Sequence, residues 1–178
     1  MSFNCSLTSN VPLECRIAVP GITSVFIFQI QNLSTLTLSG STGVVSAIAL
    51  TPGGGYQAFR YDFEKYTGKA QQDMKASSAN GVVSVDQTID IQLLRYEQVK
   101  RAQIYLLAQQ DVGIITLNND GTYWLFGATK GMTLTDTKSD FGTKGTDFSG
   151  WKLTFKGEEP VESFQVPSGL IAALLIPS

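Results

Sequence analysis

Short strand-like runs separated by glycine-containing turns recur along the chain, and this feature constrains the fold more than any other. Residues 119–159, NDGTYWLFGATKGMTLTDTKSDFGTKGTDFSGWKLTFKGEE, carry it most densely. Glycine beside Asp, Asn, Ser, Thr or Lys supplies the positive φ values of tight turns. Between these turns, WKLTFKG places Trp151, Leu153 and Phe155 on one face of a strand and its lysines on the other. The pattern predicts a series of antiparallel strands.

Two runs with period-two alternation predict a long hairpin over residues 56–93. In YQAFRYDFE, Phe59, Tyr61 and Phe63 fall on one face. In VVSVDQTIDIQL, residues 82–93, the apolar face holds Val83, Val85, Ile89, Ile91 and Leu93. The polar residues 65–81 between the runs are interpreted as a linking loop, which is longer than an ordinary hairpin turn.

Residues 23–31 and 43–50 are apolar on both faces, which is typical of strands covered on both sides. Residues 96–109 are rich in helix formers and predict one helix, with an apolar stripe through Tyr96, Val99, Ala102 and Leu106. Nine or ten strands with one helix indicate a mainly β antiparallel sandwich or small barrel. The length of 178 residues suits a single β-rich domain over 1–178.

Composition points toward association with other subunits. Charged residues make up only 16% of the chain, below the usual quarter, so less of the surface is suited to water. A formal charge of −2 disfavours a protein that grips nucleic-acid phosphates. The first ten residues, MSFNCSLTSN, do not resemble a secretory signal, and no apolar run reaches a membrane-spanning length. We therefore expect Cys5 and Cys15 to be free thiols, and no membrane partner.

The residue types disfavour catalysis and metal binding, and we predict no catalytic residue, no cofactor and no metal site. Histidine is absent, which removes the commonest general base and metal ligand. The carboxylate pairs of a glycosidase would have to be Glu158 with Glu159, or Asp62 with Glu64. Adjacent strand residues point to opposite faces, and the second pair lies on a solvent-facing side.

Two further readings concern aspartates and aromatic residues. Asp136, Asp140 and Asp147 do not have the spacing of an EF-hand loop, so we interpret them as turn formers. Four aromatic residues are candidates for a ligand-stacking platform, although their strand spacing favours the core or a subunit contact: Tyr123, Trp124, Phe126 and Trp151.

The apolar face of the predicted hairpin is the candidate subunit interface, because a hairpin that reaches out of a small domain has nothing local to cover it. The residues assigned to this interface are Phe59, Tyr61, Phe63, Tyr66, Val83, Val85 and Ile89.

The order of these motifs resembles structural proteins of tailed bacteriophages, particularly those infecting Bacteroidetes, and among these the tail tube family. The likeness spans about residues 14–166. It rests on ECRIAVPGITSVFIFQI, IITLNNDGTYWLFGATKGMTLT, FGTKGTDFSGWKLTFKGEEP and ESFQV. Its most specific part is the order N-x-D-G-x-Y-W-x-x-G followed by G-x-D-x-x-G-W-x-L-T-F-x-G-x-E.

The resemblance implies a tail-tube-type sandwich or barrel with a flanking helix and one protruding hairpin. It implies homohexameric rings, stacked into a virion tail tube assembled in the host cytoplasm, with genomic DNA passing through the lumen unbound. The hairpin 56–93 would serve stacking, while the N-terminal arm 1–12 and the C-terminal tail 169–178 would bridge neighbours. Tail terminator and neck connector proteins share this fold, so the position in the virion stays open. A non-catalytic β-sandwich binding module is the alternative from another class.

Overall fold

The computed structural model describes residues 20–40, 43–64, 66–77, 81–144 and 147–176, with the backbone alone for Val82. The described residues are mainly β. The strands are β1 (Ile22–Gln29), β2 (Leu33–Leu38), β3 (Val45–Leu50), β4 (Phe59–Asp62), β5 (Lys69–Ser77), β6 (Val82–Leu94), β7 (Val112–Asn118), β8 (Tyr123–Phe126), β9 (Thr133–Asp140), β10 (Gly150–Glu159) and β11 (Phe164–Val166). The α-helices are α1 (Gln98–Leu107) and α2 (Ser168–Leu174), and a short 3-10 turn covers Ile30–Asn32.

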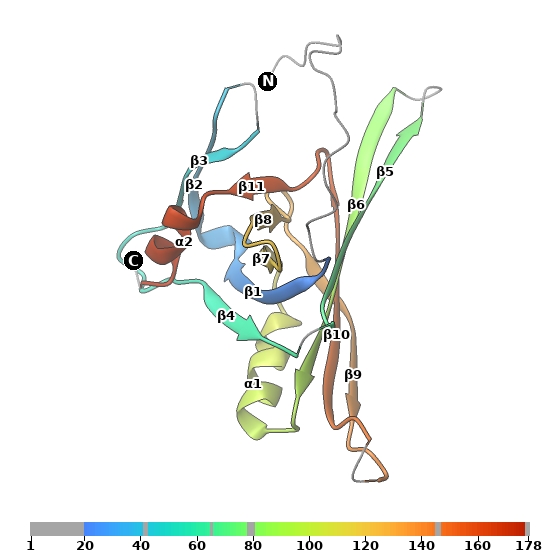
Figure 1. Cartoon of the computed structure of the whole chain (residues 1–178). Helices are drawn as coiled ribbons and strands as arrows, with labels where there is room; N and C mark the ends of the chain where they lie inside the picture. Colours follow the sequence, from blue (N-terminus) through green and yellow to red (C-terminus); the bar gives the residue numbers. More distant parts are fainter. Residues whose placement is uncertain (1–19, 41–42, 65, 78–80, 145–146, 177–178) are drawn as a thin grey trace.

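The strands form three antiparallel sheets (Figure 1). The five-stranded sheet has the order β11-β8-β7-β1-β4, and the four-stranded sheet has the order β5-β6-β10-β9. A separate hairpin pairs β2 with β3. The four-stranded sheet extends along one side of the molecule, well beyond the five-stranded sheet at its upper end.

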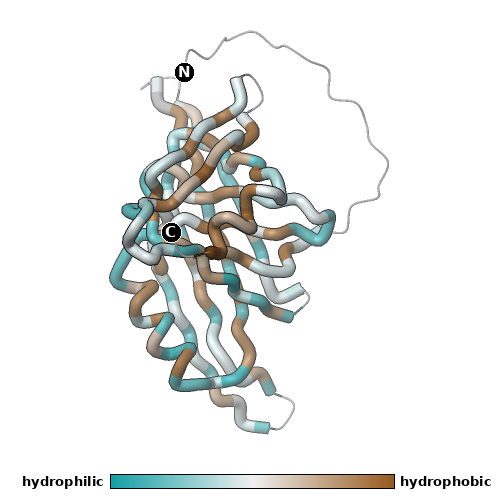
Figure 2. Tube along the Cα trace, turned by 90° about the vertical axis from the view of Figure 1, so that its left-hand side faces the viewer, coloured by the Kyte–Doolittle hydropathy of each residue, from teal (hydrophilic) through white to brown (hydrophobic). Residues whose placement is uncertain are grey.

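The five-stranded sheet is covered on both faces, so the molecule has a core on each side of it. One core lies between the two larger sheets and includes Ile27, Ile89 and Phe155, with Ile104 and Leu107 from α1. The other lies beneath the β2–β3 hairpin and α2. Figure 2 shows the apolar residues of these elements gathered in the middle of the molecule.

The prediction of a doubly covered strand is confirmed for β1, where Val25 through Phe28 are all buried. It is wrong for residues 43–50. In β3, Val45, Ile48 and Leu50 are buried while Ser46 and Ala49 are exposed. The difference arises because β3 belongs to a small outer hairpin that has solvent on one side.

The predicted pairing within the hairpin 56–93 is wrong. β4 pairs with β1 and extends the five-stranded sheet, with Tyr61 opposite Val25. The partner of β6 is β5, which lies in the segment that the sequence indicated as a loop. β5 looks like a loop because most of its residues are exposed on both faces, so burial imposes no alternation on them. A protruding hairpin does exist, but it is formed by β5 and β6.

Helix α1 lies inside the predicted range 96–109, but the predicted buried face is wrong. Ile104 and Leu107 are the buried residues, whereas Val99 and Leu106 are 73% and 53% exposed. Only a short stripe of α1 is buried because the helix covers only the end of the sandwich.

The prediction of a single helix is also wrong, because residues within the predicted tail 169–178 fold as α2. Ile171 and Leu174 are buried in the second core. Up to residue 176 this segment therefore packs on its own chain, and does not extend as an arm. The predicted arm 1–12, with Cys5 and Cys15, lies outside the described residues.

Candidate subunit interface

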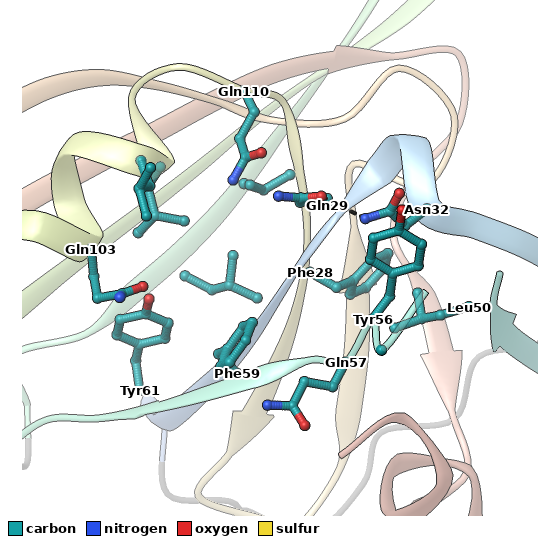
Figure 3. A pocket seen from close by; sticks show the side chains of 15 residues that line it. Phe28, Gln29, Asn32, Leu50, Tyr56, Gln57, Phe59, Tyr61, Gln103 and Gln110 are labelled. Carbon is teal, nitrogen blue, oxygen red and sulfur yellow. Dashed lines mark hydrogen bonds between the residues drawn. The ribbon is translucent and has the colours of Figure 1, made fainter. Parts of the chain in front are cut away.

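A groove with a largely apolar lining lies between α1 and the end of the five-stranded sheet. Its volume is about 370 Å³. Figure 3 shows Gln103 of α1 facing Tyr61 of β4, with Phe59 beside it and Phe28 at the floor. None of its lining residues carries a charge. The groove therefore suits an uncharged, partly apolar occupant.

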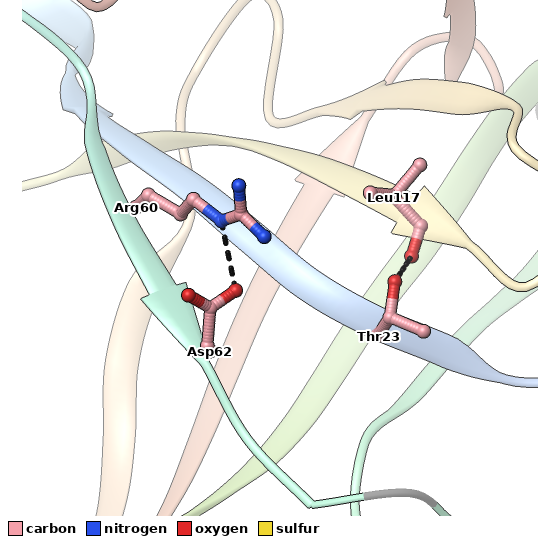
Figure 4. A network of polar contacts seen from close by, with 4 residues as sticks. All are labelled: Thr23, Arg60, Asp62 and Leu117. Atoms are coloured by element: carbon pink, nitrogen blue, oxygen red, sulfur yellow. Dashed lines mark hydrogen bonds and ion pairs between the residues drawn. The ribbon is translucent and has the colours of Figure 1, made fainter.

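Strand β4 forms one wall of this groove and is also a sheet edge. Within the described residues it pairs only with β1. Phe59 and Tyr61 point toward the groove, and Arg60 and Asp62 lie on the opposite face, where their side chains form an ion pair at 2.8 Å (Figure 4). Edge strands present unpaired backbone donors and acceptors, so β4 can accept a further strand.

The apolar surface continues from the groove along α1. Val99, Tyr105 and Leu106 are 73%, 68% and 53% exposed. Figure 2 shows apolar and polar residues interspersed along α1, at the lower left. An apolar helix face next to an open sheet edge is typical of an interface with another chain.

The protruding β5–β6 hairpin adds a second exposed apolar area. Met74 of β5 and Val83 of β6 are 58% and 51% exposed. The Lys75 ammonium donates to the Asp86 carboxylate across the hairpin, and this bond raises the Lys75 pKa. The ion pair adds a cross-strand contact on the exposed face of the β5–β6 ladder.

The seven predicted interface residues separate into two groups. Phe59, Tyr61, Phe63, Tyr66 and Val83 keep at least part of their side chains at the surface, and Tyr66 is 80% exposed. Val85 and Ile89 are fully buried in the core of their own chain, so their assignment to an interface is wrong. They were misplaced because the alternation of β6 identifies a buried face but not what covers it, which here is the five-stranded sheet.

Among the predicted interface residues, Tyr61 is the one whose pKa is shifted by its surroundings. It packs against the inner core as a half-buried side chain. Burial raises the pKa of its phenol, because the phenolate is less well solvated there. Sequence reasoning missed the other wall of the groove, since it placed Leu106 on the apolar stripe of the helix and assigned nothing to Gln103.

The two carboxylates Glu158 and Glu159 lie in different surroundings. Glu158 is exposed, whereas Glu159 is only 2% exposed. The Glu159 carboxylate accepts hydrogen bonds from the backbone N–H groups of Thr129, Lys130 and Gly131 at 2.8–3.2 Å. Gln87, also buried, accepts from the Gly127 N–H at 2.9 Å. These two side chains fix the turn between β8 and β9.

The aspartates of the turns also bind backbone groups. Asp140 accepts from the Gly142 N–H, and Asp147 accepts from the N–H groups of Thr143 and Lys144. This confirms that Asp140 and Asp147 are turn formers, whereas the prediction is wrong for Asp136, which lies within β9 opposite Thr154. Asp120 accepts from the Thr122 hydroxyl and N–H, which lowers its pKa. No group of three acidic or cysteine residues that suits a metal ion occurs among the described residues.

The tryptophans are not exposed platforms. Trp151 is 8% exposed and stacks on Tyr96, with ring centroids 4.7 Å apart. Trp124 is half-buried, and its indole N–H donates to the Thr122 hydroxyl. Both pack within the inner core cluster.

No helix in the described ranges is long and apolar enough to cross a membrane. No protein-family model matches the chain, and neither a curated protein nor a solved structure matches it.

Proposed function

We propose that the chain is a virion structural protein of a tailed bacteriophage, which assembles into rings that stack as the tail tube. The observation that supports this most is the four-stranded sheet with two open edges. Successive strands in the order β5-β6-β10-β9 are antiparallel, so the edge strands β5 and β9 run in opposite directions. Joining β9 of one copy to β5 of the next therefore continues the antiparallel pattern.

Repetition of such a head-to-tail contact around an axis closes a ring and removes both open edges. The number of copies comes from the resemblance, which implies six. At roughly 4.8 Å per strand, six four-stranded sheets give a circumference of about 115 Å and a backbone diameter of about 37 Å without strand tilt. Tilt widens the ring further. After the inward side chains are subtracted, the lumen still admits duplex DNA.

The outer face of the four-stranded sheet suits a lumen because it is polar and close to charge balance. Acidic and basic residues both occur on this face in three of its four strands, and β6 contributes only acidic ones. The acidic residues are Asp73, Asp86, Asp90, Asp136, Asp140 and Glu158, and the basic residues are Lys69, Lys75, Lys138, Lys152 and Lys156. A wall of mixed charge gives no continuous basic track to hold phosphates, so DNA can slide past it.

The proposed role is non-catalytic, and its partners are further copies of the chain with other tail or neck proteins. A tail terminator or neck connector ring would use the same edges. A β-sandwich binding module is less well supported, because burial of Trp151 and partial burial of Trp124 leave no exposed pair of tryptophans to stack a ligand.

Hydrogen exchange tests the proposed edge pairing. We expect the backbone amides of β5 and β9 to gain protection when the protein is concentrated enough to assemble. Amides of β10, which is paired on both sides, serve as the internal control because they are protected in either state. Assemblies in which β5 and β9 exchange as fast as in the dilute protein would exclude this mode of ring formation.

A further inference from the structure

The groove beside β4 has an edge strand, an apolar wall and an exposed ion pair, and the residues before Pro20 have a pattern that fits all three. In LECRIAV, residues 13–19, the apolar Leu13, Cys15 and Ile17 alternate with Glu14 and Arg16. Prolines at positions 12 and 20 bound the run, as is common at strand ends.

We propose that residues 13–19 of one copy add a strand to the β4 edge of a neighbouring copy, with their apolar side chains in the α1–β4 groove. This inference rests on the proposed function, since it requires that copies of the chain associate. It identifies a contact distinct from the β5 and β9 edges.

Charge complementarity selects the direction of the added strand. In a parallel alignment with Cys15 beside Tyr61, Glu14 lies beside Arg60 and Arg16 lies beside Asp62. In an antiparallel alignment centred on the same pair, Glu14 would lie beside Asp62 and Arg16 beside Arg60. Each side chain would then meet a charge of the same sign. Like charges on adjacent strands are destabilising. The Arg60–Asp62 pair is exposed and has no further ion-pair partner among the described residues, so it remains free to pair with the added strand.

The apolar face of the segment matches the groove. In the parallel alignment Leu13, Cys15 and Ile17 lie beside Phe59, Tyr61 and Phe63, respectively. The groove holds no charged lining residue, and Leu106 of α1 is 53% exposed at its rim. An added strand would cover this leucine and place uncharged side chains in the cavity.

The path of the chain favours a neighbouring copy. Strand β1 has β7 on one side and β4 on the other. At the start of β1 the Asn119 side chain donates to the Pro20 carbonyl at 2.8 Å, and the Asn119 N–H donates to the Gly21 carbonyl at 3.0 Å. The chain therefore enters β1 from the β7 side, away from the β4 edge. Because residue 19 is bonded directly to Pro20, the segment can join only a β4 edge that a neighbouring copy places close to the start of β1.

The native Cys15 allows a direct test with two full-length variants. The first carries Cys5→Ser and keeps Cys15; the second carries Cys5→Ser, Cys15→Ser and Tyr61→Cys. When they are mixed and oxidised with oxidised glutathione, we expect a disulfide-linked dimer with twice the 19.2 kDa mass of the chain. The matched control replaces Tyr61→Cys with Arg60→Cys, on the opposite face of the same strand, and should give no dimer.

The outcomes separate this contact from the proposed function. If circular dichroism shows that Tyr61→Cys disturbs the fold, Phe59→Cys, at a 53% exposed residue, takes its place, and the partner variant then carries Cys5→Ser, Cys15→Ser and Leu13→Cys, because Leu13 lies beside residue 59. A dimer yield no higher than in the control overturns the inference, even if the wild-type protein forms rings. An intrachain disulfide in dilute Cys5→Ser, Tyr61→Cys protein also overturns it, because the segment then fills its own groove. A dimer without rings supports the contact and contradicts the ring.

Discussion

Replacing Glu159 with Gln should destabilise the fold, although the two side chains have nearly the same shape. The carboxylate is buried and accepts three backbone N–H groups of the β8–β9 turn. Glutamine keeps one acceptor oxygen but loses the charge, and its NH₂ group faces the Thr129 N–H in one orientation. Hydrogen bonds to a charged acceptor contribute about 1.5–3 kcal/mol each, roughly twice as much as neutral ones.

Loss of charge at three such bonds, partly offset by water at the exposed Thr129 and Lys130, gives an expected cost of about 2–3 kcal/mol. For a chain of this length that corresponds to a fall in Tm of roughly 4–10 °C. The assay is urea unfolding of the dilute protein, followed by tryptophan fluorescence. Glu158→Gln is the matched control because Glu158 is exposed, and its cost should stay within about 0.5 kcal/mol. Equal costs for the two variants would refute the role assigned to Glu159.

Three other predictions concern the core, the groove and a turn. Gly113→Ala should cost about 1–3 kcal/mol in urea unfolding, because a Cβ there would lie 2.4 Å from the Phe28 ring; Gly169→Ala, with nothing within 4 Å, should be harmless. Phe59→Asp should abolish assembly in light scattering while circular dichroism stays unchanged, and Ser34→Asp on the exposed side of β2 should assemble normally. The lowered pKa of Asp120 means that its turn is stabilised above an unfolded pKa of about 3.9, and loses this stabilisation as pH falls through the folded value. The Thr122 amide shift should titrate at the lower, folded value, and a titration at about pH 3.9 would contradict this.

The raised pKa of Tyr61 gives a further reporter on the groove. Its folded value exceeds that of an unfolded chain, so its contribution to stability is complete below about pH 10 and is lost as pH rises through the folded value. Tyrosinate absorbance should therefore contain a late component that Tyr61→Phe removes. If the component that this substitution removes titrates together with the other tyrosines, Tyr61 is as solvated as they are and the account of its burial is wrong.

Sequence patterns predicted strands best where one face is buried along the whole length. β10 is the clearest case: Trp151, Leu153 and Phe155 are buried, and Lys152 and Lys156 are exposed. Alternation in β6 likewise identified the buried face correctly. The partner of each strand was not predictable in the same way, because alternation encodes burial and not the neighbour that provides it.

The errors lie where local burial is weak or where polar side chains are buried. β5 escaped prediction because most of it is exposed on both faces. Glu159 was considered only as a member of a glycosidase carboxylate pair, since nothing in GEE distinguishes a carboxylate that binds a turn from one in water. The groove depends on Gln103 and Tyr61, 42 positions apart, which the packing of α1 brings together.

The measurement that tests the central claim most directly is the solution mass of the purified full-length protein by light scattering, with negative-stain images of the same fraction. We expect a mass that is a multiple of the 19.2 kDa chain, near six copies or more, and images of rings or stacked tubes with a central hole. A monomer at every concentration that stays monomeric with its virion partners, with no ring in the images, would contradict the proposal.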